Sequence, residues 1–172
     1  MGTKAVTTQT PVGPFMRRTL RTGSVSGVLM SAVIAGASGL ATGRSLSGLN
    51  AISHMLWGPG AAREVKWSLR HTATGLALNQ LACLFWAGCY EAMLGDSRRS
   101  PGRRQGIDAI ALSGIAYLVD YHLVPKRFTP GFELTFSRAW FPILYAGLAG
   151  ALWAGAQCHR SVPATRTRSP RA

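Results

Sequence analysis

The chain has 172 residues, the size of one domain, and its 19 Lys and Arg residues against 6 Asp and Glu residues give a formal net charge of +13. Such an excess of positive charge is typical of proteins that bind nucleic acid or an anionic membrane surface. Residues 22–43, 71–90 and 139–158 contain no Asp, Glu, Lys or Arg, and uncharged runs of about 20 residues match the roughly 30 Å hydrocarbon core of a bilayer. We therefore predict an all-α, multi-pass membrane protein that interacts with anionic lipid headgroups, and we expect no nucleic-acid partner.

Residues 1–22 lack apolar periodicity and carry Arg17, Arg18 and Arg21, so they are predicted to form a basic, disordered N-terminal tail. The first span is expected at about 24–43, within a single transmembrane domain that covers residues 23–158. A positive segment before an apolar run also describes a secretory signal peptide. Cleavage that removes residues 1–41 is therefore an alternative.

The first span carries small residues at every fourth position. These residues are Gly23, Gly27, Ser31, Ala35, Gly39 and Gly43. A spacing of four places them on one face, where two helix backbones can approach closely. The face can pack against another helix of the same chain, or it can form a homo-oligomer through Gly27, Ser31, Ala35 and Gly39.

Residues 46–58 are apolar but too short to span a bilayer, and Pro59 follows them, so we predict an interfacial or re-entrant helix there. The second span is expected at about 71–94. One stripe of this span is predicted to face inward, with the residues Thr72, Gly75, Asn79, Cys83, Trp86 and Tyr90. Glu91, at its end, is expected to pair with an arginine of the following loop.

The third span is expected at about 107–125 and contains Asp108, Asp120 and His122. A charged side chain at the centre of a membrane helix costs on the order of 2.5–3.5 kcal/mol on insertion scales, so each needs a partner. Asp108 lies beside Arg103 and Arg104 at the start of the span. Asp120 is expected to accept a hydrogen bond from Arg127, a histidine, or the hydroxyl of Tyr117 or Tyr121.

The fourth span is expected at about 139–157, and the basic residues 159–172 are predicted to be a disordered tail. Twelve of the 19 Lys and Arg residues lie in the N-terminal segment, the loop between the second and third spans, and the C-terminal tail. By the positive-inside rule, both termini of this four-helix transmembrane bundle are cytoplasmic.

Four candidate metal ligands converge on the outer face in this topology: His54, His71, Asp120 and His122. Imidazoles and a carboxylate are ligands of Zn²⁺ and other divalent metals. Asp120 and His122 can share one metal only if the helix unwinds before Pro125. The alternative is that the histidines are interfacial and that Asp120 pairs with Arg127. Cys83, Cys89 and Cys158 have no metal-ligand spacing and are interpreted as packing residues.

Several segments resemble those of a family of small uncharacterised multi-pass inner-membrane proteins of proteobacteria. They are His54-Met-Leu-Trp-Gly58, Arg70-His-Thr72, Phe85-Trp86 with Tyr90-Glu91, and residues 120–133. The resemblance covers about 46–157 and implies a bacterial inner-membrane location, but no reaction.

Three functions follow from these patterns as hypotheses. The leading one is a non-enzymatic membrane assembly or interaction protein, because the chain has small-residue helix faces and lacks a Gly-rich phosphate loop, GxSxG or HExxH motif. The alternative is a membrane enzyme or carrier that binds a divalent metal through the four ligands. A small oligomeric transporter is the third.

Overall fold

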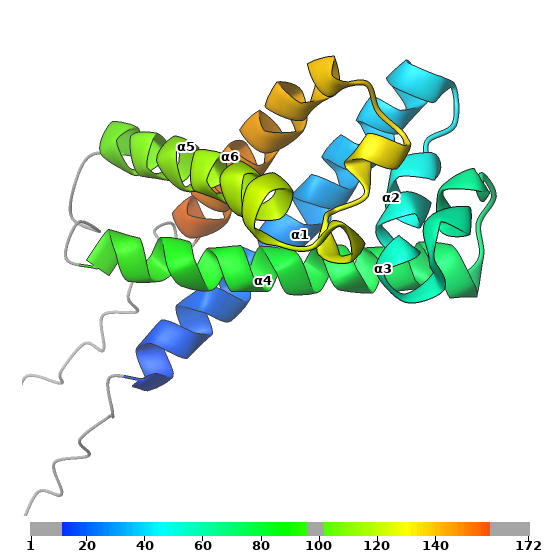
Figure 1. Ribbon diagram of the computed structural model, residues 1–172. Coiled ribbons are helices and arrows are strands. Elements are labelled where there is room, and N and C mark those ends of the chain that lie inside the picture. The colour runs from blue at the N-terminus through cyan, green and yellow to red at the C-terminus, as the bar shows by residue number, and fades with distance from the viewer. Residues whose placement is uncertain (1–11, 96–101, 159–172) are drawn as a thin grey trace, which may run out of the picture.

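The computed structural model describes residues 12–95 and 102–158, and within these ranges the chain is helical with no strand (Figure 1). This confirms the predicted all-α class. The long helices are α1 (Val12–Thr42), α4 (Thr74–Leu94), α5 (Gly102–Leu118) and α6 (Phe141–Gln157). The tail predicted at 159–172 lies outside the described residues, as do residues 1–11 and 96–101.

Helix α1 begins at Val12, so residues 12–22, which we expected in a disordered tail, are helical. Pro14 lies in the first turn, where its missing N–H costs no helical hydrogen bond. The basic turn is also held by tertiary contacts, because Arg18 and Thr22 contact Glu91 of α4. The helix is therefore stabilised by packing that sequence periodicity does not report.

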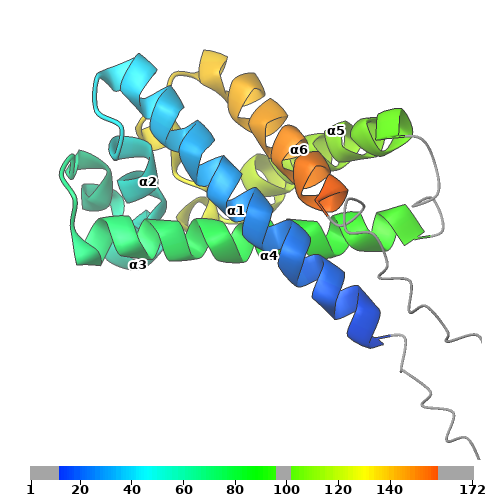
Figure 2. The ribbon, with the colours of Figure 1, turned by 180° about the vertical axis from the view of Figure 1, so that it is seen from behind.

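Helices α1 and α6 lie side by side and cross the pair formed by α4 and α5 (Figures 1 and 2). Gly155 allows the close approach of α6 to α1, since a Cβ atom at this position would lie 2.7 Å from the carbonyl oxygen of Thr22. One turn away, the Ser26 hydroxyl donates to the carbonyl oxygen of Ala151 at 3.1 Å. Small residues and a hydroxyl thus join the two helices, as is typical of membrane helix pairs.

Within residues 12–95 and 102–158, two segments are long and apolar enough to cross a membrane, Gly13–Thr42 and Arg138–Gln157. Length and composition do not confirm the expected four spans. Helix α4 has 21 residues, but Asn79, Gln80 and Glu91 lower its hydropathy. Helix α5 has 17 residues and carries Arg103 and Arg104 in its first turn.

The short helix expected at 46–58 is present as α2 (Ser47–Ile52) and α3 (His54–Trp57), followed by the 3-10 turn η1 (Pro59–Arg63). Every residue of α2 is buried. Asn50 anchors the next stretch, because its amide donates to the carbonyl oxygens of Glu64 and Lys66 at 2.9 and 3.1 Å. Its oxygen accepts from the Thr72 hydroxyl at 2.7 Å. The segment is therefore fixed to the start of α4.

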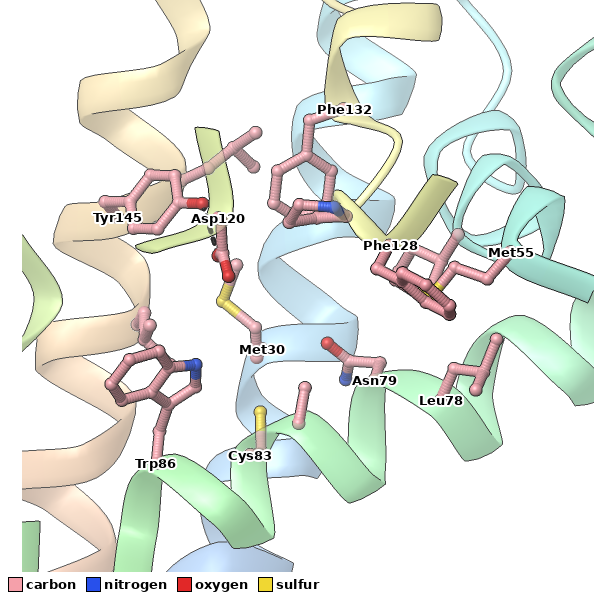
Figure 3. A pocket seen from close by; sticks show the side chains of 15 residues that line it. Met30, Met55, Leu78, Asn79, Cys83, Trp86, Asp120, Phe128, Phe132 and Tyr145 are labelled. Carbon is pink, nitrogen blue, oxygen red and sulfur yellow. Dashed lines mark hydrogen bonds between the residues drawn. The ribbon is translucent and has the colours of Figure 1, made fainter. Parts of the chain in front are cut away.

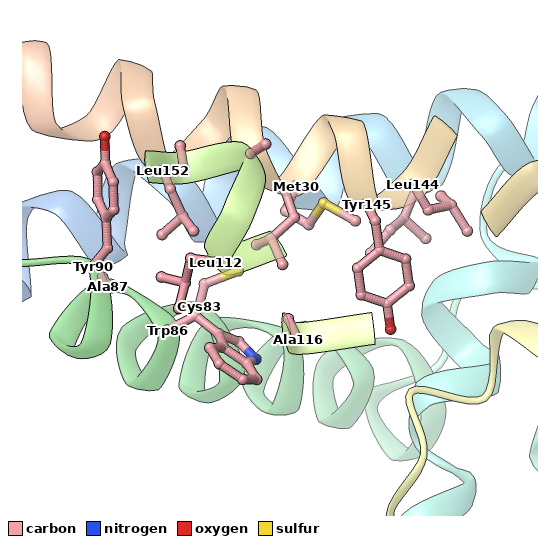
Figure 4. Packing of buried hydrophobic residues seen from close by; sticks show 14 of the residues in the cluster. Met30, Cys83, Trp86, Ala87, Tyr90, Leu112, Ala116, Leu144, Tyr145 and Leu152 are labelled. Atoms are coloured by element: carbon pink, nitrogen blue, oxygen red, sulfur yellow. The ribbon is translucent and has the colours of Figure 1, made fainter. Parts of the chain in front are cut away.

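The core lies where the four long helices meet, and large side chains of α4, α5 and α6 fill it (Figure 4). Tyr90, Leu144 and Leu152 are fully buried, and the Tyr90 hydroxyl donates to the carbonyl oxygen of Gln105 at 2.8 Å. All six residues of the predicted inward stripe are buried, which confirms that prediction. They are Thr72, Gly75, Asn79, Cys83, Trp86 and Tyr90. Thr72 lies in the π-helical turn η2 (Leu69–Ala73) and the others lie on α4.

Candidate functional site

A cavity of about 120 Å³ lies beside this stripe, between α1, α4, α6 and the segment that follows α5 (Figure 3). Its wall is mostly apolar, and we call it the Asp120 cavity after its one ionisable carboxylate. The residues that line it are Met30, Ile52, Met55, Leu78, Asn79, Ala82, Cys83, Trp86, Asp120, Phe128, Pro130, Phe132, Leu144, Tyr145 and Leu148. For scale, an engineered apolar cavity of about 150 Å³ binds benzene.

Asp120 reaches the cavity from η4 (Val119–Leu123), a π-helical turn that extends α5. Such turns insert an extra residue into a helix and often occur at functional sites. The turn ends at Val124, which is extended (ψ 146°), as expected for the residue before a proline. The chain therefore stays helical through Asp120 and His122 and becomes extended only at Val124, and the π-helical turn places the Asp120 carboxylate against α6.

The partner of Asp120 is Tyr145 of α6, whose hydroxyl donates to Oδ2 at 2.7 Å. A tyrosine hydroxyl was among the expected partners, but the prediction named Tyr117 and Tyr121 instead of Tyr145. The expected pair with Arg127 is also absent from the described residues, because the Arg127 Nε group donates instead to the carbonyl oxygen of Met55 at 3.2 Å. Asp120 thus has a hydrogen-bond donor but no cationic partner in the described chain.

Asn79 places a second acceptor at the cavity. Its amide nitrogen donates to the carbonyl oxygen of Gly27 at 3.1 Å and to the Ser31 hydroxyl at 3.0 Å, which fixes the side chain against α1. The amide oxygen is directed toward the cavity (Figure 3). Trp86, one helical turn beyond Cys83, adds an aromatic ring whose N–H faces the same space.

The segment after Pro125 covers the cavity with Phe128, Pro130 and Phe132. His54 of α3 fastens this segment, because its ring nitrogens lie 2.9 Å from the carbonyl oxygen of Ala51 and 3.5 Å from that of Lys126. Gly131 packs against the same ring with φ +78°, a conformation that favours glycine. The cover is therefore held by backbone contacts to a buried histidine.

The structure does not assemble the four predicted metal ligands. Among the residues it describes, no group of three or more His, Cys, Asp or Glu side chains is close enough to hold a metal ion. His54 is engaged by backbone carbonyls, and the Nδ1 atom of His71 lies 3.2 Å from the Ser68 hydroxyl. His122 packs on the ring of Tyr117, with 5.7 Å between ring centroids. Each imidazole therefore has a different neighbour, and the four predicted ligands do not share one site.

A second carboxylate, fully buried, lies near the end of α4. Glu91 is 2 % exposed, accepts from the Thr22 hydroxyl at 2.7 Å, and lies 3.8 Å from Nε of Arg18. Arg18 of α1 is thus one partner of Glu91. Arg98 and Arg99 of the following loop lie outside the described residues, so the expected pair with a loop arginine stays a prediction. The helix crossing brings the basic turn of α1 to the end of α4, and this contact is not visible in sequence spacing.

The small-residue face of α1 packs within the chain. A Cβ atom at Gly27 would lie 2.1 Å from the amide oxygen of Gln80, and one at Gly23 would lie 2.8 Å from Cα of Leu84. Ser31 accepts from Asn79. Of the two interpretations of this face, packing against another helix of the same chain is therefore observed for Gly23, Gly27 and Ser31. Helix α4 covers those positions.

Comparison with known proteins finds no match to this chain among protein-family models, curated proteins or solved structures. What the protein binds must therefore be inferred from the residues of the cavity. Of these, Asp120 was singled out from the sequence, and Asn79, Cys83 and Trp86 were placed on the inward stripe. Tyr145 was missed, because its role depends on how α6 packs against η4.

Proposed function

We propose that the chain is a non-enzymatic, multi-pass protein of the bacterial inner membrane, and that its Asp120 cavity binds a small apolar ligand with an ammonium group. The proposed membrane location rests on where the apolar and polar side chains lie, which is the reverse of the arrangement in a water-soluble protein. Large apolar side chains are exposed on the outer faces of all four long helices, including Val28, Leu81, Phe85, Ile110 and Ile143. Polar side chains are buried between the helices, including Thr22, Ser26, Asn79, Glu91 and Ser113.

This arrangement suits a hydrocarbon surrounding, where outward apolar side chains cost nothing and polar groups must find partners inside. It supports four spans at about 24–43, 71–94, 107–125 and 139–157, with α4 and α5 crossing the bilayer beside α1 and α6. The excess of Lys and Arg at the termini and at 98–104 supports cytoplasmic termini. The resemblance of residues 46–157 to a proteobacterial inner-membrane family agrees with this location.

The binding part of the proposal rests on one observation: a carboxylate lies at an apolar cavity without a cationic partner among the described residues. Tyr145 satisfies only part of the acceptor capacity of Asp120. The oxygen of Asn79 is a second acceptor at the same cavity. An ammonium group supplies both the missing charge and several N–H donors.

The cavity does not carry the pattern of an acid–base or nucleophilic site. The cysteine at the cavity, Cys83, has no histidine among its neighbours in the cavity wall. Asp120 has one tyrosine partner and no second general acid or base in that wall. The geometry therefore supports binding rather than catalysis.

Isothermal titration calorimetry on the purified protein in lipid nanodiscs tests the binding proposal. n-Butylammonium and the uncharged 1-butanol are the matched probes, and Asp120→Asn removes the charge while keeping the shape of the side chain. We expect the variant to bind n-butylammonium at least tenfold more weakly than the wild type, with 1-butanol unaffected. Equal binding of n-butylammonium by both proteins would refute the role of Asp120.

A further inference from the structure

A groove runs along the outer surface between α5 and α6, and it shares one lining residue, Tyr145, with the Asp120 cavity. Its apolar part, about 570 Å³, is lined by residues that include Ile110, Gly114, Ala146, Gly150 and Trp153. Its polar part, about 900 Å³, is lined by residues that include Tyr117, Tyr121, His122, Glu133 and Arg138. The two parts share Gly114, Pro142 and Tyr145, so they form one continuous groove.

The apolar part is open because two glycines leave it empty. A Cβ atom built at Gly114 or at Gly150 would meet no heavy atom within 4 Å. Its polar groups are already engaged, since the Ser113 hydroxyl donates to the backbone carbonyl of Tyr145 and the Trp153 indole donates to the carbonyl oxygen of Gly102 at 3.1 Å. The groove therefore offers apolar surface with no hydrogen bond to satisfy, which suits a hydrocarbon chain.

The polar part of the groove contains a guanidinium group, that of Arg138, with no partner among the described residues. Arg138 is exposed at the start of the α6 segment and makes no ion pair or hydrogen bond with the described residues. The neighbouring carboxylate of Glu133 accepts from the Thr129 hydroxyl at 2.5 Å and from the Tyr121 hydroxyl at 3.1 Å, so hydroxyl groups engage it. His122 is exposed beside it and adds a second nitrogen-bearing group.

We propose that this groove binds one bilayer phospholipid, with an acyl chain against Gly114 and Gly150 and the phosphate at Arg138. From Arg138 to Trp153 the helix rises about 22 Å, which exceeds the roughly 15 Å of hydrocarbon in one leaflet. The arginine therefore lies at headgroup depth when the apolar part lies in the bilayer, and a guanidinium matches the geometry of a phosphate. The inference rests on the proposed membrane location but not on the ligand of the Asp120 cavity.

Native mass spectrometry of the detergent-purified protein, delipidated and then titrated with phosphatidylglycerol, tests the inference. Gly114→Leu and Gly150→Leu fill the groove, and both replace a helical glycine by a better helix former, so the fold is expected to persist. Gly36→Leu is the matched control, because this α1 glycine also has open space around it and lies outside the groove. We expect one tightly retained lipid in the wild type and in Gly36→Leu, and at least tenfold weaker retention in both groove variants.

The headgroup contact is tested with Arg138→Gln, and Arg44→Gln serves as the control at another exposed arginine. Only Arg138→Gln should weaken retention of phosphatidylglycerol. Equal retention in the wild type and both groove variants, with unfolding temperatures unchanged, would overturn the inference. It would also be overturned if the groove variants converted a dimer into a monomer, since the groove would then be a protein interface. Recovery of the chain in the soluble fraction after an alkaline wash would instead refute the membrane location itself.

Discussion

Glu91 and Asp120 are carboxylates held between helices of the same bundle, and their surroundings differ in two respects, the presence of a cation and the presence of open space. Glu91 is enclosed, with the Thr22 hydroxyl at 2.7 Å and the Arg18 guanidinium at 3.8 Å. Asp120 has the Tyr145 hydroxyl at 2.7 Å and faces a cavity. A carboxylate with a cation and no space holds helices together, whereas one with space and no cation is suited to bind a ligand.

The comparison predicts that Glu91 matters most for stability. Glu91→Ala should lower the free energy of unfolding by about 3 kcal/mol, because it empties the space of a fully buried side chain and leaves the Thr22 hydroxyl without its acceptor. Chemical unfolding in detergent micelles followed by circular dichroism measures this loss. Glu91→Gln is the control, since an amide oxygen can still accept from Thr22 and a smaller loss is expected. An unchanged unfolding midpoint for Glu91→Ala would show that Glu91 does not hold the helices together.

Asp120→Asn should change the same free energy of unfolding by less than about 1 kcal/mol, because Asn can still accept from Tyr145 and no ion pair is lost. The same substitution should abolish the preference for n-butylammonium over 1-butanol. Unfolding curves and calorimetry on one preparation give both quantities. A stability loss as large as that of Glu91→Ala would mean that Asp120 is a structural group.

Tyr145→Phe sharpens the contrast by removing the only hydroxyl that donates to Asp120 in the described residues. We expect a stability loss of about 1 kcal/mol, the net worth of a typical hydrogen bond. The affinity for n-butylammonium should change by less than tenfold, because the carboxylate stays in place. Tyr117→Phe is the matched control: its ring packs against Tyr145 at 5.4 Å between centroids, but its hydroxyl makes no hydrogen bond to the described residues. If both variants behave alike, the hydroxyl of Tyr145 is unimportant.

Arg18→Gln should have the smallest effect, below about 1 kcal/mol, because the guanidinium is 35 % exposed and its attraction to Glu91 is screened by water. Unfolding at low and high salt measures it. The difference between wild type and variant should shrink as salt rises. A salt-independent loss of several kcal/mol would indicate packing rather than charge.

The fold class and the inward face of α4 could be predicted because they follow from the spacing of residues along one helix. The stripe from Thr72 to Tyr90 needed only the helical period, and all six of its members are buried. The contacts of Arg18 with Glu91 and of Tyr145 with Asp120 could not be predicted, because Arg18 and Tyr145 lie on helices distant in sequence from these carboxylates. Chain order placed the histidines near one end of the bundle, but the local hydrogen bonds of His54 and His71 direct each ring to a different neighbour.

The difference between the two carboxylates is tested most directly by the thermal shift that n-butylammonium causes in three proteins measured side by side. A ligand that binds only the folded state raises the unfolding temperature, and at a fixed ligand concentration a tighter ligand raises it more. The wild type and Glu91→Gln should both be stabilised by the amine, although Glu91→Gln starts from a lower temperature, and Asp120→Asn should not respond. A shift that persists in Asp120→Asn, or one that disappears in Glu91→Gln, would contradict the assignment of ligand binding to Asp120 and of helix packing to Glu91.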